Sequence, residues 1–300
     1  MTLPILHRWM KRLEQHPRHA AILYMLISTA GFSLMNIFVR MASESLSPTA
    51  LVTLRNALTL TLIIPFVVPG RFAVIRTARL KGHIGRSIVG AVGMLAWTYS
   101  LTLMPLTHAT ALSFTTPLLV TLLAMLFLGE KADARHIFAL AVGFLGTLII
   151  LRPTAEGFDL NSLWVLLATA SWATTSMFIK SLTSTEPPIR MVFYMNLFMF
   201  LIALPFATSG WHWPDAATWL ALLGVSLCSI LMHVTLVKAY ILAPVVTLMP
   251  IDFMRLVFTS LLAYFFFGET SDLATWLGSA VIIASAVFAS ARKSKPALTD

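Results

Sequence analysis

Long apolar stretches alternate with short polar connections along the whole chain. Ten stretches are apparent, at about residues 20–41, 48–68, 84–104, 106–128, 133–151, 160–180, 189–208, 214–237, 245–267 and 272–290. Most are close to the roughly 20 residues that an α-helix needs to cross the hydrocarbon core of a bilayer. The pattern predicts an all-α membrane protein with ten transmembrane helices. The stretch at 160–180 is the least apolar, because hydroxyl side chains lie along it, and these can bond within or between membrane helices.

The composition agrees with this prediction. Hydrophobic residues make up 58% of the 300 residues and charged residues only 11%, whereas about a quarter of the residues of a soluble protein are charged. The mean hydropathy is +0.85. The single cysteine, Cys228, lies in an apolar stretch and is expected to pack as a small core residue. One cysteine excludes an intramolecular disulfide and a cysteine-based metal cluster, and we expect neither a bound metal nor a cofactor.

The formal net charge of +9 arises from basic residues near the ends of the apolar stretches. If the N-terminus is cytoplasmic, every lysine and arginine falls on the cytoplasmic side except Arg40 and Arg152 at the other face and Arg55 and Arg255 within spans. Basic residues are enriched in cytoplasmic connections. Both termini are therefore predicted to be cytoplasmic, with a basic segment at 1–19 and a tail at 291–300. No cleaved signal peptide is expected, because no small-residue cleavage pattern follows, and the charge requires no nucleic-acid partner.

The chain contains an internal repeat whose matching segments lie a nearly constant distance apart in the sequence. Leu122-Leu123-Ala124 matches Leu261-Leu262-Ala263, and Phe127-Leu128-Gly129-Glu130 matches Phe266-Phe267-Gly268-Glu269 at the same offset; Phe38-Val39-Arg40 matches Phe178-Ile179-Lys180 at an offset one position longer. The repeat divides the chain into halves at about 20–152 and 158–290, with five predicted helices each. Because five is odd, the second half is expected to enter the membrane from the opposite side. Inverted repeats of this kind are typical of secondary transporters.

Charge near the two Gly-Glu motifs agrees with inversion. Lys131 and Arg135 follow Glu130, whereas Glu269 is followed by Asp272 and no nearby basic residue. Matched motifs with opposite charge bias are expected at opposite faces of the membrane.

The same motifs mark a family. Gly-Glu after the fourth helix of each half, the aromatic and basic residues at 32–40 and 172–180, and Pro117 in the fourth helix resemble the EamA-type drug/metabolite transporters. The resemblance extends from about Ala20 to Ala291 and implies a metabolite transporter without naming its substrate. Ala243-Pro244 and the segment 252–256 are similar to the branch that includes S-adenosylmethionine carriers. In one departure, Leu256 stands where the first half has Pro117, and the proline of the second half lies earlier, at Pro250.

Two charged residues lie deep in the ninth stretch. Asp252 and Arg255 are separated by three residues, so they share one helical face and can pair. A charge at the centre of a membrane helix costs about 2.5–3.5 kcal/mol on insertion scales. The pair is either a structural ion pair or one wall of a polar substrate cavity. Pro250 before it and Pro117 in the fourth helix, beside Ser113, are expected to kink corresponding helices, which is a common position for a transporter site.

Other polar and aromatic residues are candidates for substrate contact. Arg55, beside Asn56, either extends toward the membrane face or holds a carboxylate or phosphate. Asn36 makes either a bond between helices or a substrate contact. The aromatic and hydroxyl candidates are Tyr99, Phe114, Trp172, Thr175 and Ser176. His108 and His233 can change charge in the range of a proton gradient, and Asp252 is a further candidate for proton coupling, although pairing with Arg255 holds a carboxylate ionised.

These features favour a secondary active or facilitative transporter of a small organic metabolite, such as an amino acid, a nucleoside or S-adenosyl compound, or a vitamin. Alternating access across the bacterial inner membrane is expected, by a monomer or weak homodimer, with protons as a candidate coupling ion. The sequence has no GxxxxGK[ST] pattern for ATP-driven pumping. The alternatives are a polytopic membrane enzyme acting on a lipid-linked substrate, which needs clustered acids or metal ligands at one face, and a scaffold or insertion chaperone.

Overall fold

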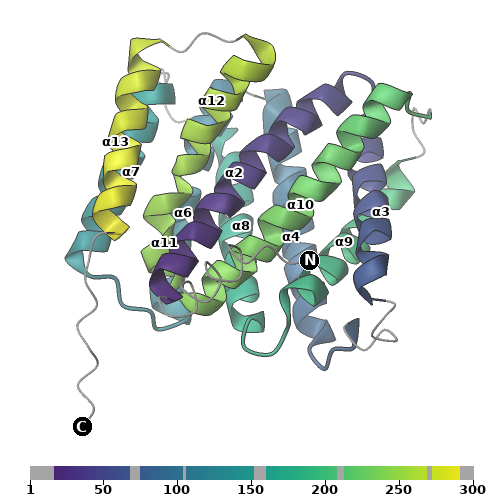
Figure 1. Ribbon diagram of the computed structural model, residues 1–300, viewed down its shortest axis with the longest axis horizontal. Coiled ribbons are helices and arrows are strands. Elements are labelled where there is room, and N and C mark those ends of the chain that lie inside the picture. The colour runs from purple at the N-terminus through teal and green to yellow at the C-terminus, as the bar shows by residue number, and fades with distance from the viewer. Residues whose placement is uncertain are drawn as a thin grey trace, which may run out of the picture.

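The structure, a computed structural model, describes residues 17–67, 75–103, 106–151, 160–207, 213–268 and 272–290. Helices joined by turns make up these ranges, and no strand occurs in them (Figure 1). The elements are α2 (Pro17–Ser43), α3 (Pro48–Val67), α4 (Leu80–Leu103), α5 (Leu106–Ser113), α6 (Thr116–Phe127), α7 (Ala134–Leu151), α8 (Ser162–Leu182), α9 (Pro188–Ala203), the short 3-10 helix η3 (Leu204–Phe206), α10 (Ala216–Leu242), α11 (Val245–Asp252), α12 (Met254–Phe267) and α13 (Leu273–Ser290). Residues 1–16 and 291–300, within the predicted cytoplasmic segments, lie outside the described residues.

Each predicted apolar stretch contains a helix, but two of them contain more than one. The stretch at 106–128 forms α5 and α6, and the stretch at 245–267 forms α11 and α12. Single kinked helices were expected there, and the structure divides both. Eight segments are long and apolar enough to cross a membrane by length and composition, α11 with α12 counting as one; α4, α5 and α6 are not among them. The protein is therefore an all-helical, multi-pass membrane protein.

Small residues allow the helices to approach one another closely. Phe178 of α8 lies over Gly85 of α4, where an added Cβ would come within 3.3 Å of its ring, and Phe38 of α2 lies over Gly224 of α10, where the distance would be 2.7 Å. Membrane helices associate through such close packing, because lipid tails are as apolar as the helix surfaces. A side chain at Gly224 would displace the Phe38 ring.

At one edge of the bundle, α7 and α13 lie side by side with their backbones in contact (Figure 1). A Cβ added at Gly278 would lie 2.6 Å from the carbonyl oxygen of Gly146, and one at Gly146 would lie 3.0 Å from the carbonyl oxygen of Gly278. Ser285 of α13 also donates a hydrogen bond to the carbonyl oxygen of Ala139, at 2.6 Å. This pair joins the last helix of one half to the last helix of the other.

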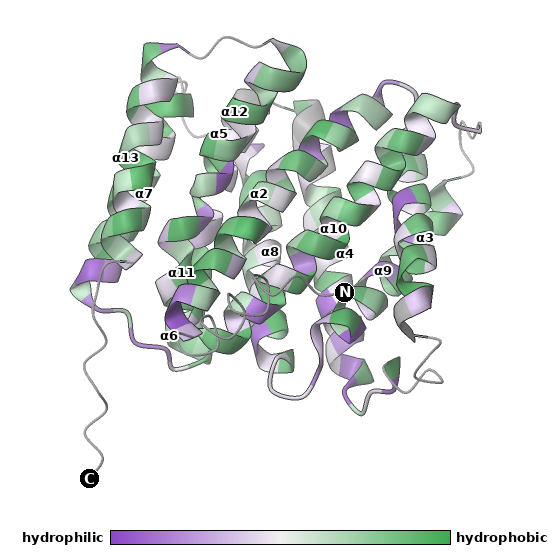
Figure 2. Ribbon diagram, viewed as in Figure 1, coloured by the Kyte–Doolittle hydropathy of each residue, from purple (hydrophilic) through white to green (hydrophobic). Residues whose placement is uncertain are grey.

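The two ends of the bundle differ in charge. At the lower end in Figure 1, Arg18 of α2 donates to the carbonyl oxygen of Ala289 in α13 at 3.2 Å, so the described chain begins and ends at the same side. Figure 2 shows hydrophilic segments gathered at this end, where the basic loops lie. At the other end the helix connections carry the acidic residues Glu44, Asp215 and Asp272.

Candidate functional site

The break between α11 and α12 places two charged residues inside the bundle. Pro250 has no N–H to continue the helical hydrogen bonding, and the N–H of Phe253 bonds to the carbonyl oxygen of Ile251. Asp252 ends α11 and Arg255 lies in the first turn of α12. Arg255 Nη2 lies 3.4 Å from Asp252 Oδ2, and each side chain is 19% exposed. The two side chains therefore pair, and both remain partly accessible.

Aromatic rings surround the Arg255 guanidinium. Its Cζ lies 4.8 Å from the ring centroid of Phe114 and 5.5 Å from that of Phe32. A cation over an aromatic face is attracted by the ring quadrupole. Apart from the ion pair, the Arg255 side chain makes no hydrogen bond within the described part of the chain, although guanidinium has five N–H donors. Several of its donors are therefore free to bind a ligand.

Ser33 of α2 fixes the backbone beside Arg255. Its Oγ lies 3.0 Å from the carbonyl oxygen of Thr29 and 2.8 Å from that of Arg255, and it can donate to either. Thr259 of α12 donates to the same Oγ, at 3.0 Å. The fully buried Ser33 therefore links α2 to the first turn of α12 beside the break.

The two helix breaks meet through a pair of phenylalanines. Phe114 lies between α5 and α6, Phe253 lies between α11 and α12, and their rings stack with centroids 6.3 Å apart. Phe253 is fully buried and fits against Gly143 of α7, where an added Cβ would come within 2.7 Å of its ring. The two phenylalanines occupy equivalent positions in the two halves. Residues that the repeat matches to each other therefore contact each other between the two helix breaks.

A second group of predicted residues lies on α8, facing α4 and α10. Trp172 packs against Trp97 with ring centroids 5.6 Å apart. Thr175 has a buried Oγ1 with no hydrogen-bond partner among the described atoms. Ser176 donates to the carbonyl oxygen of Trp172 at 3.2 Å. Ala173 and Met177 of α8 belong to the same buried cluster as Phe114 and Phe253, so α8 adjoins the site at the helix break.

The remaining predicted residues differ in how they are placed relative to this site. Tyr99 is 49% exposed and packs edge-on against the exposed Trp164, so it does not join the other candidates. Asn36 is half-buried on α2, one turn from Phe32, and makes no hydrogen bond within the described residues. Ser113 donates to the carbonyl oxygen of Thr110 beside the first break. The side chain of His108 lies outside those that the structure describes.

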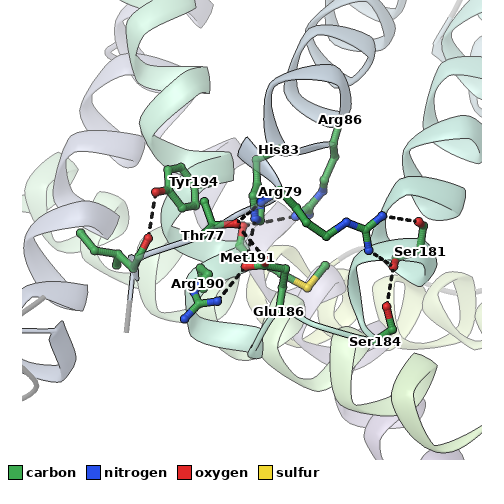
Figure 3. A network of polar contacts seen from close by, with 11 residues as sticks. Thr77, Arg79, His83, Arg86, Ser181, Ser184, Glu186, Arg190, Met191 and Tyr194 are labelled. Atoms are coloured by element: carbon green, nitrogen blue, oxygen red, sulfur yellow. Dashed lines mark hydrogen bonds and ion pairs between the residues drawn. The ribbon is translucent and has the colours of Figure 1, made fainter. Parts of the chain in front are cut away.

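The sequence did not indicate the buried network at the lower end of α4, α8 and α9 (Figure 3). The Glu186 carboxylate accepts hydrogen bonds from Thr77 at 2.8 Å and Arg190 at 3.1 Å, and it lies 3.4 Å from His83 Nε2. Burial raises the pKa of Glu186, but the hydrogen bonds from Thr77, Arg190 and His83 outweigh it and hold the pKa below its ordinary value. His83 and Glu186 lie on different helices far apart in the sequence, and no local pattern links them.

The first Gly-Glu motif has a role that the sequence reading missed. Gly129 adopts a positive φ of 66°, as does its counterpart Gly268, and this left-handed conformation ends a helix at little cost for glycine. Glu130 then accepts a hydrogen bond from the N–H of Val246 at 3.0 Å, in the first turn of α11. A carboxylate at a helix N-terminus is stabilised by the unpaired N–H groups there. Lys180 donates to the carbonyl oxygen of Ala243, at 3.0 Å, just after α10.

Chemistry other than binding has little support among the described residues. They contain no group of three or more His, Cys, Asp or Glu side chains that could hold a metal ion. The features that do converge are a broken helix, an accessible ion pair and aromatic rings within a membrane bundle. Such an arrangement, with polar groups beside aromatic rings at a discontinuous helix, is one that can hold a solute between membrane helices.

Comparison with known proteins identifies the family. The chain matches the EamA-like transporter family over residues 19–152 and 160–291, one match for each half, and it belongs to that family. It is 31% identical to a riboflavin transporter of Vibrio cholerae over 281 residues, which cover 92% of this chain and 94% of the relative. It is also 32% identical to an S-adenosylmethionine uptake transporter of Rickettsia conorii over 226 residues, covering 75% and 77%.

A solved crystal structure has the same fold. It aligns with a TM-score of 0.77 at 18% identity and covers 90% of this chain and 96% of that chain. The family and the relatives confirm that the protein is a multi-pass bacterial transporter of a small metabolite and not the lipid-directed enzyme considered above.

Proposed function

We propose that the protein moves a small organic metabolite across the bacterial inner membrane by alternating access between two inverted five-helix halves. Ten helices cross the membrane in this arrangement, α5 with α6 and α11 with α12 each forming one broken span. The observation that carries the proposal is the accessible Asp252/Arg255 pair, held between the rings of Phe32 and Phe114 where the second broken helix opens. Transporter sites are commonly built from such discontinuous helices.

Equivalent contacts in the two halves support the inverted repeat. The contact of Phe178 with Gly85 has its counterpart in the contact of Phe38 with Gly224, since the repeat matches Phe38 to Phe178 and Gly85 to Gly224. Asn56 and Asn196, also matched by the repeat, are both buried and both donate to the carbonyl oxygen four residues earlier, at 2.7 and 2.8 Å. Two halves with equivalent contacts can exchange roles, which gives two states of similar energy that open to opposite sides.

The charge at the two ends supports a cytoplasmic location for both termini. Arg18, Arg79, Arg135 and Lys180 all bond backbone carbonyl groups at the end where the described part of the chain begins and finishes. Arg40 lies at the other end, over the ring of Phe267. Basic residues are retained on the cytoplasmic side.

The substrate is expected to combine a planar ring with polar groups. The rings of Phe32 and Phe114 offer flat apolar surfaces beside the charged pair, and the relatives are named for riboflavin and S-adenosylmethionine. Uptake of each compound into proteoliposomes, with and without a pH gradient, tests the proposal and any coupling to protons. Chemical conversion of the solute in place of flux would contradict it.

Topology is tested with cysteine labelling. Cys228 is replaced by alanine, and cysteines are placed at Arg40 or Lys180, which the repeat assigns to opposite faces. A membrane-impermeant maleimide should label Arg40→Cys in intact spheroplasts and Lys180→Cys only after lysis. Labelling of both from the same side would refute the inverted arrangement, and an active phosphatase fused after Asp300 would refute the cytoplasmic C-terminus.

A further inference from the structure

The two helix breaks are built alike but differ in charge. Asp252 and Arg255 lie at the second break, and the repeat matches them to Ser113 and Thr116 at the first. Ser113 donates to the carbonyl oxygen of Thr110 at 2.7 Å and Thr116 donates to that of Ser113 at 2.6 Å, so each hydroxyl is satisfied within its own segment. The first break forms with uncharged side chains at these positions. The charges at the second break are therefore not needed to make a break of this kind.

The protein itself satisfies this charged pair only loosely. Arg255 Nη2 lies 3.4 Å from Asp252 Oδ2, whereas charge-assisted hydrogen bonds between such groups are about 2.7–2.9 Å long. Within the described part of the chain, the side chains of Asp252 and Arg255 make no hydrogen bond to any other residue. A carboxylate offers about four acceptor sites and a guanidinium five N–H donors. Most of the bonding capacity of both groups is therefore available at one place, where both are partly exposed.

The opposite signs of the two charges limit the ligands that can bind between them. An anion that binds Arg255 alone would leave Asp252 without its partner, and a cation that binds Asp252 alone would leave Arg255 without its own. An unpaired charge in a protein interior is strongly destabilising. A ligand that carries both charges compensates both residues at once, and the site keeps a net charge of zero. The pair therefore favours a ligand with one positive and one negative group close together.

Aromatic rings supply an apolar surface beside the pair. The Arg255 Cζ lies 4.8 Å from the ring centroid of Phe114 and 5.5 Å from that of Phe32. Phe114 is fixed in turn by its stacking on the fully buried Phe253. Binding sites for small molecules commonly combine an aromatic lining with a few placed polar groups. The surroundings suit a solute in which a charged end is attached to a flat or apolar body.

We infer that the transported metabolite is a zwitterion whose carboxylate is bound by Arg255 and whose protonated amine is bound by Asp252, as in an α-amino acid group. This inference rests on the proposed transport function and adds the charge of the substrate to it. The parallel N–H donors of a guanidinium match the two oxygens of a carboxylate. In an α-amino acid one carbon joins the amine to the carboxylate, so both groups can reach two side chains that share a helical face.

Charge selectivity can be measured in detergent without transport. Four probes share one ring: L-phenylalanine has both charges, its amide only the positive one, N-acetyl-L-phenylalanine only the negative one, and N-acetyl-L-phenylalaninamide neither. In a second series, S-adenosyl-L-homocysteine is compared with adenosine, which lacks the amino acid group. Thermal unfolding of the full-length protein is followed at constant ionic strength and about pH 6, where α-amino groups are protonated and carboxyl groups ionised.

The wild type should prefer the zwitterion in at least one series. Its Tm should rise saturably with that zwitterion, and the other members of the series should bind about tenfold more weakly or worse, the effect of losing hydrogen bonds to a charged group. A wild type that binds the zwitterion of neither series, or binds it no more tightly than the neutral member, would overturn the inference.

Single variants should change the preferred charge in opposite directions. Asp252→Asn leaves only the guanidinium and should favour the negatively charged probe, whereas Arg255→Gln leaves only the carboxylate and should favour the positively charged one. A purely structural ion pair predicts no such exchange. A Glu44→Gln, Lys131→Gln variant, changed at two exposed positions, should keep the preference of the wild type.

The neutral double variant keeps the test valid if a single variant does not fold. Asp252→Asn, Arg255→Gln leaves no unpaired charge and should fold, but it should lose the preference for the zwitterion; retained preference would overturn the inference. In proteoliposomes, flux of an uncharged solute that the double variant abolishes would refute the zwitterionic substrate and leave the transport function standing. Selective binding of the zwitterion without flux of any solute would refute the transport function instead.

Discussion

Two groups of charged residues inside this protein differ in how completely they are satisfied. Glu186, at the lower end of the bundle, is 2% exposed and receives hydrogen bonds from Thr77 and Arg190 beside His83. Asp252, at the helix break, is 19% exposed and has one ionic partner, at 3.4 Å. The Glu186 carboxylate finds its partners within the network, although His83 Nδ1 is buried there without one, whereas the Asp252/Arg255 pair keeps accessible atoms and unused donors. The difference separates a group that holds helices together from one available to a solute.

The physical basis is the cost of leaving charge unpaired. A fully bonded buried network rigidifies the elements that it joins, and removing one member exposes the others to the full desolvation cost. A loosely paired, partly exposed charged group loses less stabilising free energy when its partner is removed, and it gains more when a ligand binds. Variants of the Glu186 group should therefore lower stability more than transport, and variants of the Asp252/Arg255 pair should lower transport more than stability.

The largest effect on stability is expected at Glu186. Glu186→Ala should lower the free energy of unfolding by about 3 kcal/mol or more, because Arg190 and His83 lose their buried carboxylate. Thermal unfolding in detergent measures the loss, and flux per folded molecule should change little. Glu44→Ala, at an exposed position, is the control. A Glu186→Ala variant as stable as the wild type would contradict the structural role of the Glu186 network.

The largest effect on transport is expected at the helix break. The Asp252→Leu, Arg255→Met double variant should reach normal membrane yield and elute as one species, because the two charges disappear together. Its flux should fall about 100-fold, or about 2.8 kcal/mol at 1.4 kcal/mol per factor of ten. A Glu44→Gln, Lys131→Gln variant removes an exposed charge of each sign and serves as control. An active double variant would falsify the substrate role of the pair.

A smaller effect is expected from the ring over Arg255. Phe114→Leu keeps apolar bulk but removes the aromatic face 4.8 Å from the guanidinium. A cation over a ring contributes about 0.5–2 kcal/mol, so the substrate concentration for half-maximal flux should rise about two- to thirtyfold. Phe138→Leu makes the same change at an exposed aromatic position and should leave the substrate concentration for half-maximal flux unaltered. Equal responses of the two variants would argue against an aromatic contact with substrate.

The pH dependence of stability should follow Glu186. Its pKa lies below the ordinary value in the folded protein, so on acidification the unfolded chain takes up the proton first. The stabilisation is therefore complete above about pH 4.3, the ordinary value for glutamate, and is lost as the pH falls through the lower folded pKa. Tm of the wild type and of Glu186→Gln, measured from neutral to acid pH, should converge at the acid end. A constant difference would contradict the assignment.

Local spacing explains why much of the fold follows from the sequence. Apolar runs of about 20 residues form helices in almost any membrane context, because backbone groups must bond internally. Asp252 and Arg255 were paired from spacing alone, since residues three apart share a helical face. The match of Gly129 with Gly268 likewise appears in the structure as the same positive φ at both positions. Each of these features depends either on residues a few positions apart or on a motif that occurs once in each half.

Contacts between helices were decided only by the tertiary structure. The stacking of Phe114 on Phe253 and the pairing of His83 with Glu186 depend on how each helix is rotated about its axis. Tyr99, a candidate from the sequence, packs on exposed Trp164 because of that rotation. Sequence periodicity fixes which residues share a face, but close packing at glycines such as Gly85 and Gly224 determines which face meets which neighbour.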